Sequence, residues 1–95
     1  MDADERMAKA RAELDRDQPG RALRSAWEAA FAAEYVRDPD ILDEIQSFAA
    51  QLEERTEGGE LEESRRLAVY CAACSEDIRA GIPHDSTLSR LFRRR

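Results

Sequence analysis

Two cysteines separated by two residues are the first feature of this sequence that could do chemistry. Cys71 and Cys74, in the stretch CAAC, have the spacing of a thiol redox pair or of half a zinc site. A redox pair normally lies at a helix N-terminus, where the helix dipole lowers the thiol pKa, and a zinc site needs about four ligands. These cysteines instead lie on an apolar stripe of helical spacing between Leu67 and Ile78. We interpret them as buried packing residues, with an intersubunit metal or disulfide as the alternative.

Three neighbouring residues, His84, Asp85 and Ser86, have the residue types of a hydrolytic triad. Adjacent residues in one loop cannot adopt the geometry of a nucleophile, a base and an orienting group, which come from separate elements. We interpret them as an exposed loop in which Asp85 or Ser86 caps a last helix. The sequence contains no glycine-rich phosphate loop, paired-histidine metal motif or nucleophile elbow. It therefore predicts a protein that is not an enzyme and that has no cofactor or metal.

Charge is distributed unevenly along the chain. The net charge is −6, and Arg90 and residues 93–95 contribute positive charge at the end, so the preceding residues carry about −10, which disfavours nucleic acid. We expect the segment Arg90–Arg95 to solubilise the protein or to pair with its acidic surface, rather than to contact nucleic acid or membrane. The acidic run EERTEGGELEES, residues 53–64, is typical of a solvated turn, and its alternative role is to dock a basic partner.

Four stretches of the chain carry apolar residues at steps of three and four, the period of an amphipathic helix. Prolines at 19 and 39 and glycines at 58, 59 and 81 separate these stretches. The pattern predicts four helices, at about residues 3–16, 19–36, 40–56 and 60–80. Short turns make consecutive helices antiparallel neighbours. We expect a single all-α domain over residues 1–87, followed by a short basic segment, residues 88–95.

The composition indicates a source and a compartment. Arginine supplies every basic residue except Lys9, alanine is abundant and asparagine is absent, which is typical of a GC-rich and therefore bacterial coding bias. The first residues, MDADERMAKARAELD, are charged, and no apolar run approaches the ~18 residues of a membrane span. We expect a cytoplasmic protein whose two cysteines are reduced thiols.

Three small residues in the first predicted hairpin, Ala10, Ala22 and Ala29, are separated by twelve and then seven positions. This spacing resembles a tetratricopeptide repeat, in which small residues lie where two paired helices cross closely. Asp17 replaces the turn glycine of that family, and Pro39 ends the second helix about one turn late. The resemblance covers residues 3–39, and the second hairpin shares only its architecture. It implies two stacked helical hairpins, whereas the alternative is an up-down four-helix bundle.

The resemblance also implies a binding groove on the first and third predicted helices. Its candidate partner-binding residues are Arg11, Asp15, Asp43, Ser47 and Gln51. The expected function is that of an adaptor that binds a basic segment of a partner protein. One alternative is a structural homo-oligomeric bundle, and another is a regulator that contacts nucleic acid or membrane through its arginine-rich end.

Large side chains complete the predicted core. Trp27, Phe31 and Phe48 lie on or beside apolar stripes, so we expect them to anchor the packing between helices. The second predicted helix has almost no polar side over residues 26–36, which predicts burial on several sides. Repeat stacks usually need at least ~3 units, so a homodimer or the C-terminal segment, through Leu88, Leu91 and Phe92, is expected to cover the apolar ends.

Overall fold

A computed structural model describes residues 2–82, and the structural statements below concern these residues. The chain forms four helices, α1 (Ala3–Asp15), α2 (Pro19–Tyr35), α3 (Pro39–Arg55) and α4 (Gly58–Arg79), and the described part contains no strand. The predicted all-α fold is confirmed, and each predicted helix end lies within two residues of the observed one. Within the described part, no helix combines the length and apolar character needed to cross a membrane.

The start of two helices is fixed by an aspartate. The Asp2 carboxylate accepts a hydrogen bond from the Glu5 backbone N–H at 2.8 Å, and Asp38 accepts one from the N–H of Asp40 at 3.1 Å. Both carboxylates satisfy N–H groups that have no partner inside the helix. Two helices begin with a proline, α2 with Pro19 and α3 with Pro39. A proline lacks a backbone N–H, and in the first turn of a helix that N–H would have no partner inside the helix.

The ends of α1, α2 and α4 share one hydrogen-bonded turn. The residue after the C-cap has a left-handed backbone in each case, with φ of 61° at Asp17, 55° at Arg37 and 76° at Gly81. The next N–H donates to a carbonyl five residues back, at 2.8–2.9 Å, in the pairs Gln18 to Glu13, Asp38 to Ala33 and Ile82 to Asp77. This is the Schellman motif, and after α1 and α2 it reverses the chain so that the next helix runs antiparallel.

The helices approach closely because small side chains line their contacts. Five alanines of α2 are fully buried, Ala22, Ala26, Ala29, Ala30 and Ala33. Ala10 of α1 is fully buried as well, and Phe48, Cys71 and Cys74 complete the core on the α3–α4 side. Alanine has little side-chain volume, so the backbones of α1, α2 and α3 can pack at short range.

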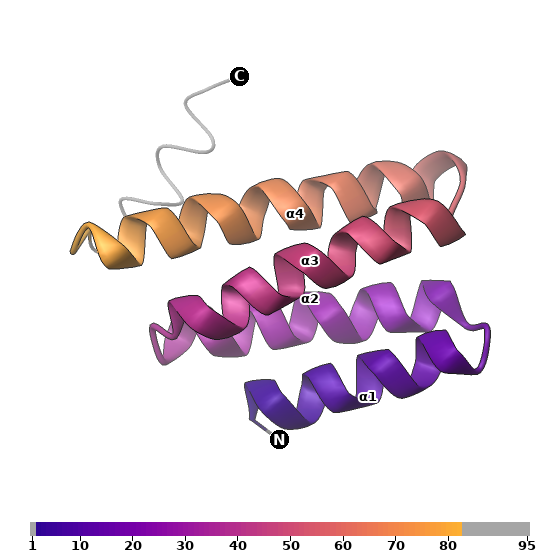
Figure 1. Cartoon of the computed structure of the whole chain (residues 1–95), viewed down its shortest axis with the longest axis horizontal. Helices are drawn as coiled ribbons and strands as arrows, with labels where there is room; N and C mark the ends of the chain where they lie inside the picture. Colours follow the sequence, from indigo (N-terminus) through magenta and orange to yellow (C-terminus); the bar gives the residue numbers. More distant parts are fainter. Residues whose placement is uncertain (1, 83–95) are drawn as a thin grey trace.

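The four helices form an open row (Figure 1). Each helix packs mainly on its neighbour in sequence, and α1 and α4 lie on opposite sides of the row without an extensive contact in the described residues. A closed up-down bundle would bring its first and last helices together. The dimensions, 37 × 30 × 16 Å, are those of a flat layer. The arrangement is therefore that of two adjacent hairpins, α1–α2 and α3–α4.

One predicted core anchor is wrong. Phe31 is 56% exposed, and Trp27 is only partly buried. The buried side of α2 is made by its alanines, whereas Trp27, Phe31 and Tyr35 follow at steps of four along the other side of the helix. The prediction of burial on several sides is likewise wrong for Phe31, Tyr35 and Val36, which stay exposed although Tyr70 of α4 packs against the ring of Phe31.

Candidate protein-binding surface

Four of the five predicted groove residues are exposed. Arg11 and Asp15 lie on α1, and Ser47 and Gln51 lie on α3. The Arg11 guanidinium is 3.7 Å from the Glu44 carboxylate of α3, so an ion pair links the two helices. An exposed ion pair of this kind contributes about 0–1 kcal/mol, and these four residues do not line the hollows described below.

Asp43, the fifth predicted groove residue, is held by α4. Its carboxylate accepts a hydrogen bond from the Ser75 hydroxyl at 2.7 Å and from the Arg79 guanidinium at 2.7 Å. The bond from Arg79, followed by that from Ser75, lowers the pKa of Asp43. The side chain therefore fastens α3 to α4, and it is not a free ligand for a partner.

An exposed apolar surface lies instead at the C-terminal end of α2. Tyr35 is 88% exposed, Val36 64% and Phe31 56%. Single exposed hydrophobic residues are normal on a protein surface, but three within six residues at one helix end form a patch of the kind that marks interaction sites. We call it the α2-end surface, and it comprises Phe31, Ala32, Tyr35, Val36, Ile41 and Ala3 together with the carboxylates of Asp2, Asp4 and Asp38.

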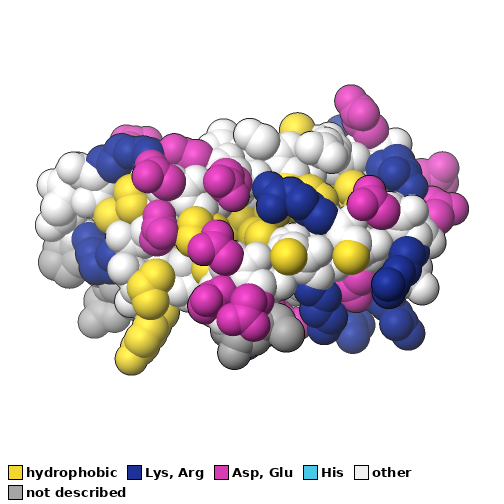
Figure 2. Space-filling model, turned by 60° about the horizontal axis from the view of Figure 1, so that its bottom comes forward, with side chains coloured by type: hydrophobic (Ala, Val, Ile, Leu, Met, Phe, Trp, Pro, Cys, Tyr) yellow, Lys and Arg dark blue, Asp and Glu magenta, His cyan; other side chains and the backbone are white. Residues whose placement is uncertain are grey.

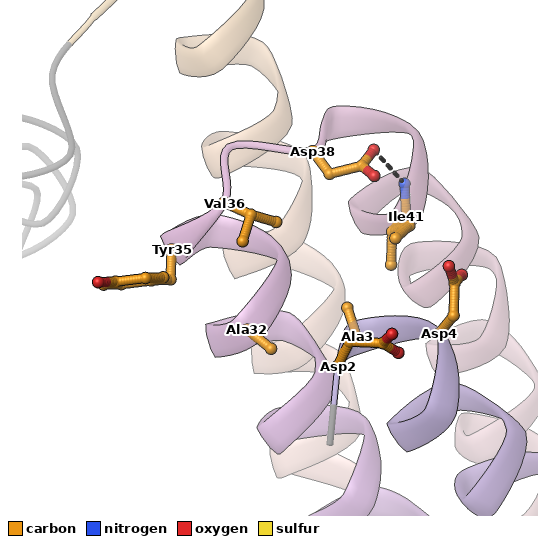
Figure 3. A pocket seen from close by; sticks show the side chains of 8 residues that line it. All are labelled: Asp2, Ala3, Asp4, Ala32, Tyr35, Val36, Asp38 and Ile41. Atoms are coloured by element: carbon orange, nitrogen blue, oxygen red, sulfur yellow. Dashed lines mark hydrogen bonds between the residues drawn. The ribbon is translucent and has the colours of Figure 1, made fainter.

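A hollow of about 390 Å³ opens in the α2-end surface, where the end of α2 meets the starts of α1 and α3 (Figure 3). Its apolar lining comes from Ala3, Ala32, Val36 and Ile41, and carboxylates lie around it at Asp2, Asp4 and Asp38. The Tyr35 ring points outward, away from the other side chains drawn (Figure 3). The hollow thus combines an apolar floor with an acidic rim.

The rim is negative even though two of its carboxylates cap helices. Asp2 and Asp38 each accept a hydrogen bond from a backbone N–H at a helix start. The N-termini of α1 and α3 each contribute about half a positive charge, and the C-terminus of α2 contributes about half a negative charge. Three carboxylates outweigh these partial charges, so the hollow favours a cationic group beside an apolar one.

A second hollow, of about 460 Å³, lies on the other side of Tyr35 and is lined by Phe31, Glu34, Tyr35 and Arg37. Tyr35 therefore borders both hollows. The Arg37 guanidinium donates a hydrogen bond to the Ile82 carbonyl at 2.8 Å, which places the end of the described chain at the edge of this hollow.

Three aromatic rings hold Phe31 in place. The ring centroids of Trp27, Phe31 and Tyr70 are 5.5–5.9 Å apart, within the range of favourable aromatic pairs. The Tyr70 hydroxyl donates to the Glu34 carboxylate, which is 4% exposed, and the Cys74 thiol lies 3.5 Å from the same oxygen. Burial, followed by the bond to Glu34, raises the pKa of Tyr70. The rings therefore form a fixed platform on α2 and α4.

The two cysteines lie in the core of the α3–α4 hairpin. Burial raises the pKa of Cys74 to about 12, with the Glu34 charge next in importance, and burial likewise raises the pKa of Cys71. Both thiols are free and protonated at neutral pH, so neither is a nucleophile. No group of three potential metal ligands occurs in residues 2–82. His84, Asp85, Ser86 and the segment 88–95 lie outside the described residues.

The acidic run, residues 53–64, lies at the turn between α3 and α4, where two of its carboxylates pair with arginines. Glu53 is 3.3 Å from Arg65, and Glu63 is 2.6 Å from Arg66. Figure 2 shows acidic and basic side chains interspersed on one face of the molecule, with exposed apolar side chains among them. Charge alone therefore does not single out a site, and the α2-end surface is distinguished by its exposed apolar side chains.

Sequence reasoning missed the α2-end surface, although one signal pointed to it. Trp27, Phe31 and Tyr35 form their own stripe at steps of four, separate from the alanine stripe of α2. A single partner helix in a hairpin can bury only one apolar stripe, so the second stripe of α2 needs another partner or stays exposed. Comparisons with protein family models, curated proteins and solved structures found no match, so the candidate site rests on its geometry.

Proposed function

We propose that this protein is a non-enzymatic, tetratricopeptide-like interaction module. Its α2-end surface binds a partner segment in which an apolar residue lies beside basic residues. The observation that carries the proposal is the exposure of Tyr35 and Val36 at an apolar hollow with three carboxylates at its rim, with the exposed Phe31 in the second hollow that Tyr35 also borders.

Two physical terms favour such a ligand. Removing apolar surface from water contributes roughly 25 cal/mol per Å², and tyrosine is among the side chains that most often dominate binding energy. The carboxylates of Asp2, Asp4 and Asp38 attract arginine or lysine and repel acidic segments, which adds specificity. Since the surface lies on helix ends that are already fixed, little ordering is needed on binding.

The tetratricopeptide resemblance is supported by a detail of the first turn. Asp17, at the position of the family's turn glycine, has φ of 61°, a conformation that glycine adopts at least cost. The open row of two hairpins also suits a repeat stack. The proposed surface nevertheless departs from the groove that the resemblance implies, because it lies at the end of α2 rather than along α1 and α3.

The proposal places the protein in the bacterial cytoplasm. Its free cysteines suit a reducing compartment, and its arginine-rich composition suits a GC-rich genome. A homodimer remains the second candidate, because the exposed Phe31, Tyr35 and Val36 of two copies could cover one another. Light scattering of the purified protein across a dilution series separates a stable dimer from a monomer that needs a partner.

A random peptide display library selected on the full-length protein tests the proposed ligand. We expect the enriched peptides to combine aromatic or aliphatic residues with arginine or lysine. Replacing Tyr35 with alanine should weaken their binding about tenfold or more, as expected for loss of an interface anchor worth about 1.4–2 kcal/mol.

Val69→Ala is the matched control for Tyr35→Ala. Val69 is 62% exposed on α4, so this substitution also removes an exposed hydrophobic side chain without opening the core. Peptide affinity should be unchanged in this variant. Enrichment of acidic peptides, or equal affinity for the Tyr35→Ala variant and the native chain, would contradict the proposal.

A further inference from the structure

We propose that residues 83–95 of the same chain occupy the α2-end surface when no partner is bound. The inference rests on the proposed function, because it names a ligand for the same surface. The chain's own C-terminal segment then covers the α2-end surface, and a partner segment must displace it in order to bind.

The described chain ends at the edge of this surface. The left-handed turn at Gly81 ends α4, and the Ile82 N–H donates to the Asp77 carbonyl at 2.8 Å. The Ile82 carbonyl accepts the hydrogen bond from Arg37, whose neighbour in sequence is Val36 and which borders the second hollow. The described chain therefore ends, at Ile82, beside the hollow that Phe31 and Tyr35 line.

The remaining residues have the chemistry that the surface fits. The sequence PHDSTLSRLFRRR contains three large apolar residues, Leu88, Leu91 and Phe92, and four arginines, one at position 90 and three at 93–95. Apolar residues directly beside arginines match the first hollow, which has an apolar floor and an acidic rim and shares Tyr35 with the hollow beside Ile82, and the preceding chain is acidic as a whole.

The connection is long enough for this contact. An extended chain spans about 3.3–3.6 Å per residue, so the six residues from Ile82 to Leu88 can cover about 20 Å. Along α2, the distance from Phe31 to Arg37 is only about 9 Å at 1.5 Å per residue. A tethered segment also acts at an effective concentration on the order of 1 mM, so weak intrinsic affinity is sufficient for it to occupy the site.

NMR spectroscopy of the full-length chain tests the contact directly. We expect nuclear Overhauser effects between the side chains of Leu91 or Phe92 and the rings of Phe31 or Tyr35, with chemical shifts that do not depend on protein concentration. The double variant Leu91→Ala/Phe92→Ala should shift the amide signal of Val36. The matched double variant Thr87→Ala/Ser89→Ala changes the same segment without removing apolar side chains and should leave that signal in place.

Peptide affinity separates this inference from the proposed function. If the segment occupies the site with an intrinsic dissociation constant near 0.1 mM, the Leu91→Ala/Phe92→Ala variant should bind a display-selected peptide about tenfold more tightly than the native chain. Unchanged affinity together with absent Overhauser effects overturns the inference, while Tyr35-dependent peptide binding keeps the proposed function. Overhauser effects that appear only at high protein concentration would show that the segment binds a second copy of the protein, and this result also overturns the inference.

Discussion

Glu34 places a carboxylate beneath the exposed aromatic residues of α2. It is 4% exposed and accepts a hydrogen bond from the Tyr70 hydroxyl, with the Cys74 thiol beside it. A buried carboxylate needs hydrogen-bond donors, because removing it from water is costly. The Tyr70 hydroxyl thus links the position of the aromatic platform to the stability of the fold.

Tyr70→Phe is expected to lower the free energy of unfolding by about 1–3 kcal/mol, because the buried Glu34 side chain then loses the hydrogen bond from the Tyr70 hydroxyl. Urea denaturation at neutral pH measures the change. Tyr35→Phe is the matched control, since the Tyr35 side chain is 88% exposed, and its effect should stay within about 0.5 kcal/mol. Equal losses of unfolding free energy in the two variants would contradict a stabilising role for the hydrogen bond between Tyr70 and Glu34.

The buried thiols predict a loss of stability in alkali. The folded-state pKa of Cys74, about 12, and the raised pKa of Cys71 lie above the unfolded value. Unfolding therefore releases protons once the pH exceeds the unfolded thiol pKa of about 8.5. The thiols' contribution to stability is complete below that pH and should fall as the pH rises from about 8.5 towards the folded value of about 12, by up to roughly 1.4 kcal/mol per pH unit for each thiol.

Urea denaturation across this pH range measures the slope, and the Cys71→Ala/Cys74→Ala variant is its control. In the variant without thiols, the free energy of unfolding should stay nearly constant from pH 8.5 to about pH 10, where tyrosine ionisation begins to contribute. A native protein whose stability is constant between pH 8.5 and 10 would contradict the burial of the two cysteines. The same burial predicts that neither thiol reacts with a thiol reagent at pH 8 unless the protein is first denatured.

Turn residues determine how each helix ends. Asp17 and Arg37 adopt a left-handed backbone in two of the three Schellman turns, where glycine is the usual residue. The Asp17 carboxylate also pairs with Arg55 at 2.7 Å, but the pair is exposed and contributes little. The conformation of this turn therefore dominates the effect of substitutions at Asp17.

Asp17→Gly should leave stability unchanged or raise it by up to about 1 kcal/mol, because glycine adopts positive φ without steric cost. Asp17→Val should lower it by about 1–2 kcal/mol, since a β-branched residue is least compatible with this conformation. Thermal unfolding of the two variants measures the difference. Destabilisation by glycine and tolerance of valine would contradict the left-handed turn.

The helices could be predicted from sequence because their signals are local. Proline in the first turn, capping aspartates and apolar steps of three and four act within a few residues of one another. The exposure of Phe31 could not be predicted, because it depends on which of the two stripes of α2 meets a neighbouring helix. The hollow at the α2-end surface was hidden for a similar reason, since it joins Ala3, Val36 and Ile41 from three helix ends.

At the scale of the whole molecule, the open row of helices explains why an apolar surface remains. A closed bundle would bury both stripes of α2, whereas in the row α4 packs on the aromatic stripe through Tyr70 and leaves Phe31 and Tyr35 exposed. Figure 1 shows α2 between α1 and α3, with its C-terminal end at the same end of the molecule as the C-terminus of α4. The surface left open lies where Ile82 ends the described chain, so one end of the molecule gathers the features on which both proposals depend.

Asp43 shows the limit of assigning a groove by resemblance. The three alanines singled out by the spacing of small residues, Ala10, Ala22 and Ala29, are fully buried, and close packing constrains residue size at such positions. Polar side chains follow no such rule, and Asp43 is held by Ser75 and Arg79 from a helix far away in the sequence. Long-range pairing of this kind cannot be read from the spacing of residues within one helix.

Titration of a display-selected peptide into isotope-labelled full-length protein, followed by amide chemical shifts, tests the central claim most directly. The account predicts that the largest shifts fall on Ala3, Tyr35, Val36 and Ile41, at the end of α2 and the adjoining starts of α1 and α3. Shifts confined to the predicted groove at Arg11, Ser47 and Gln51, or to the acidic turn at residues 53–64, would contradict it.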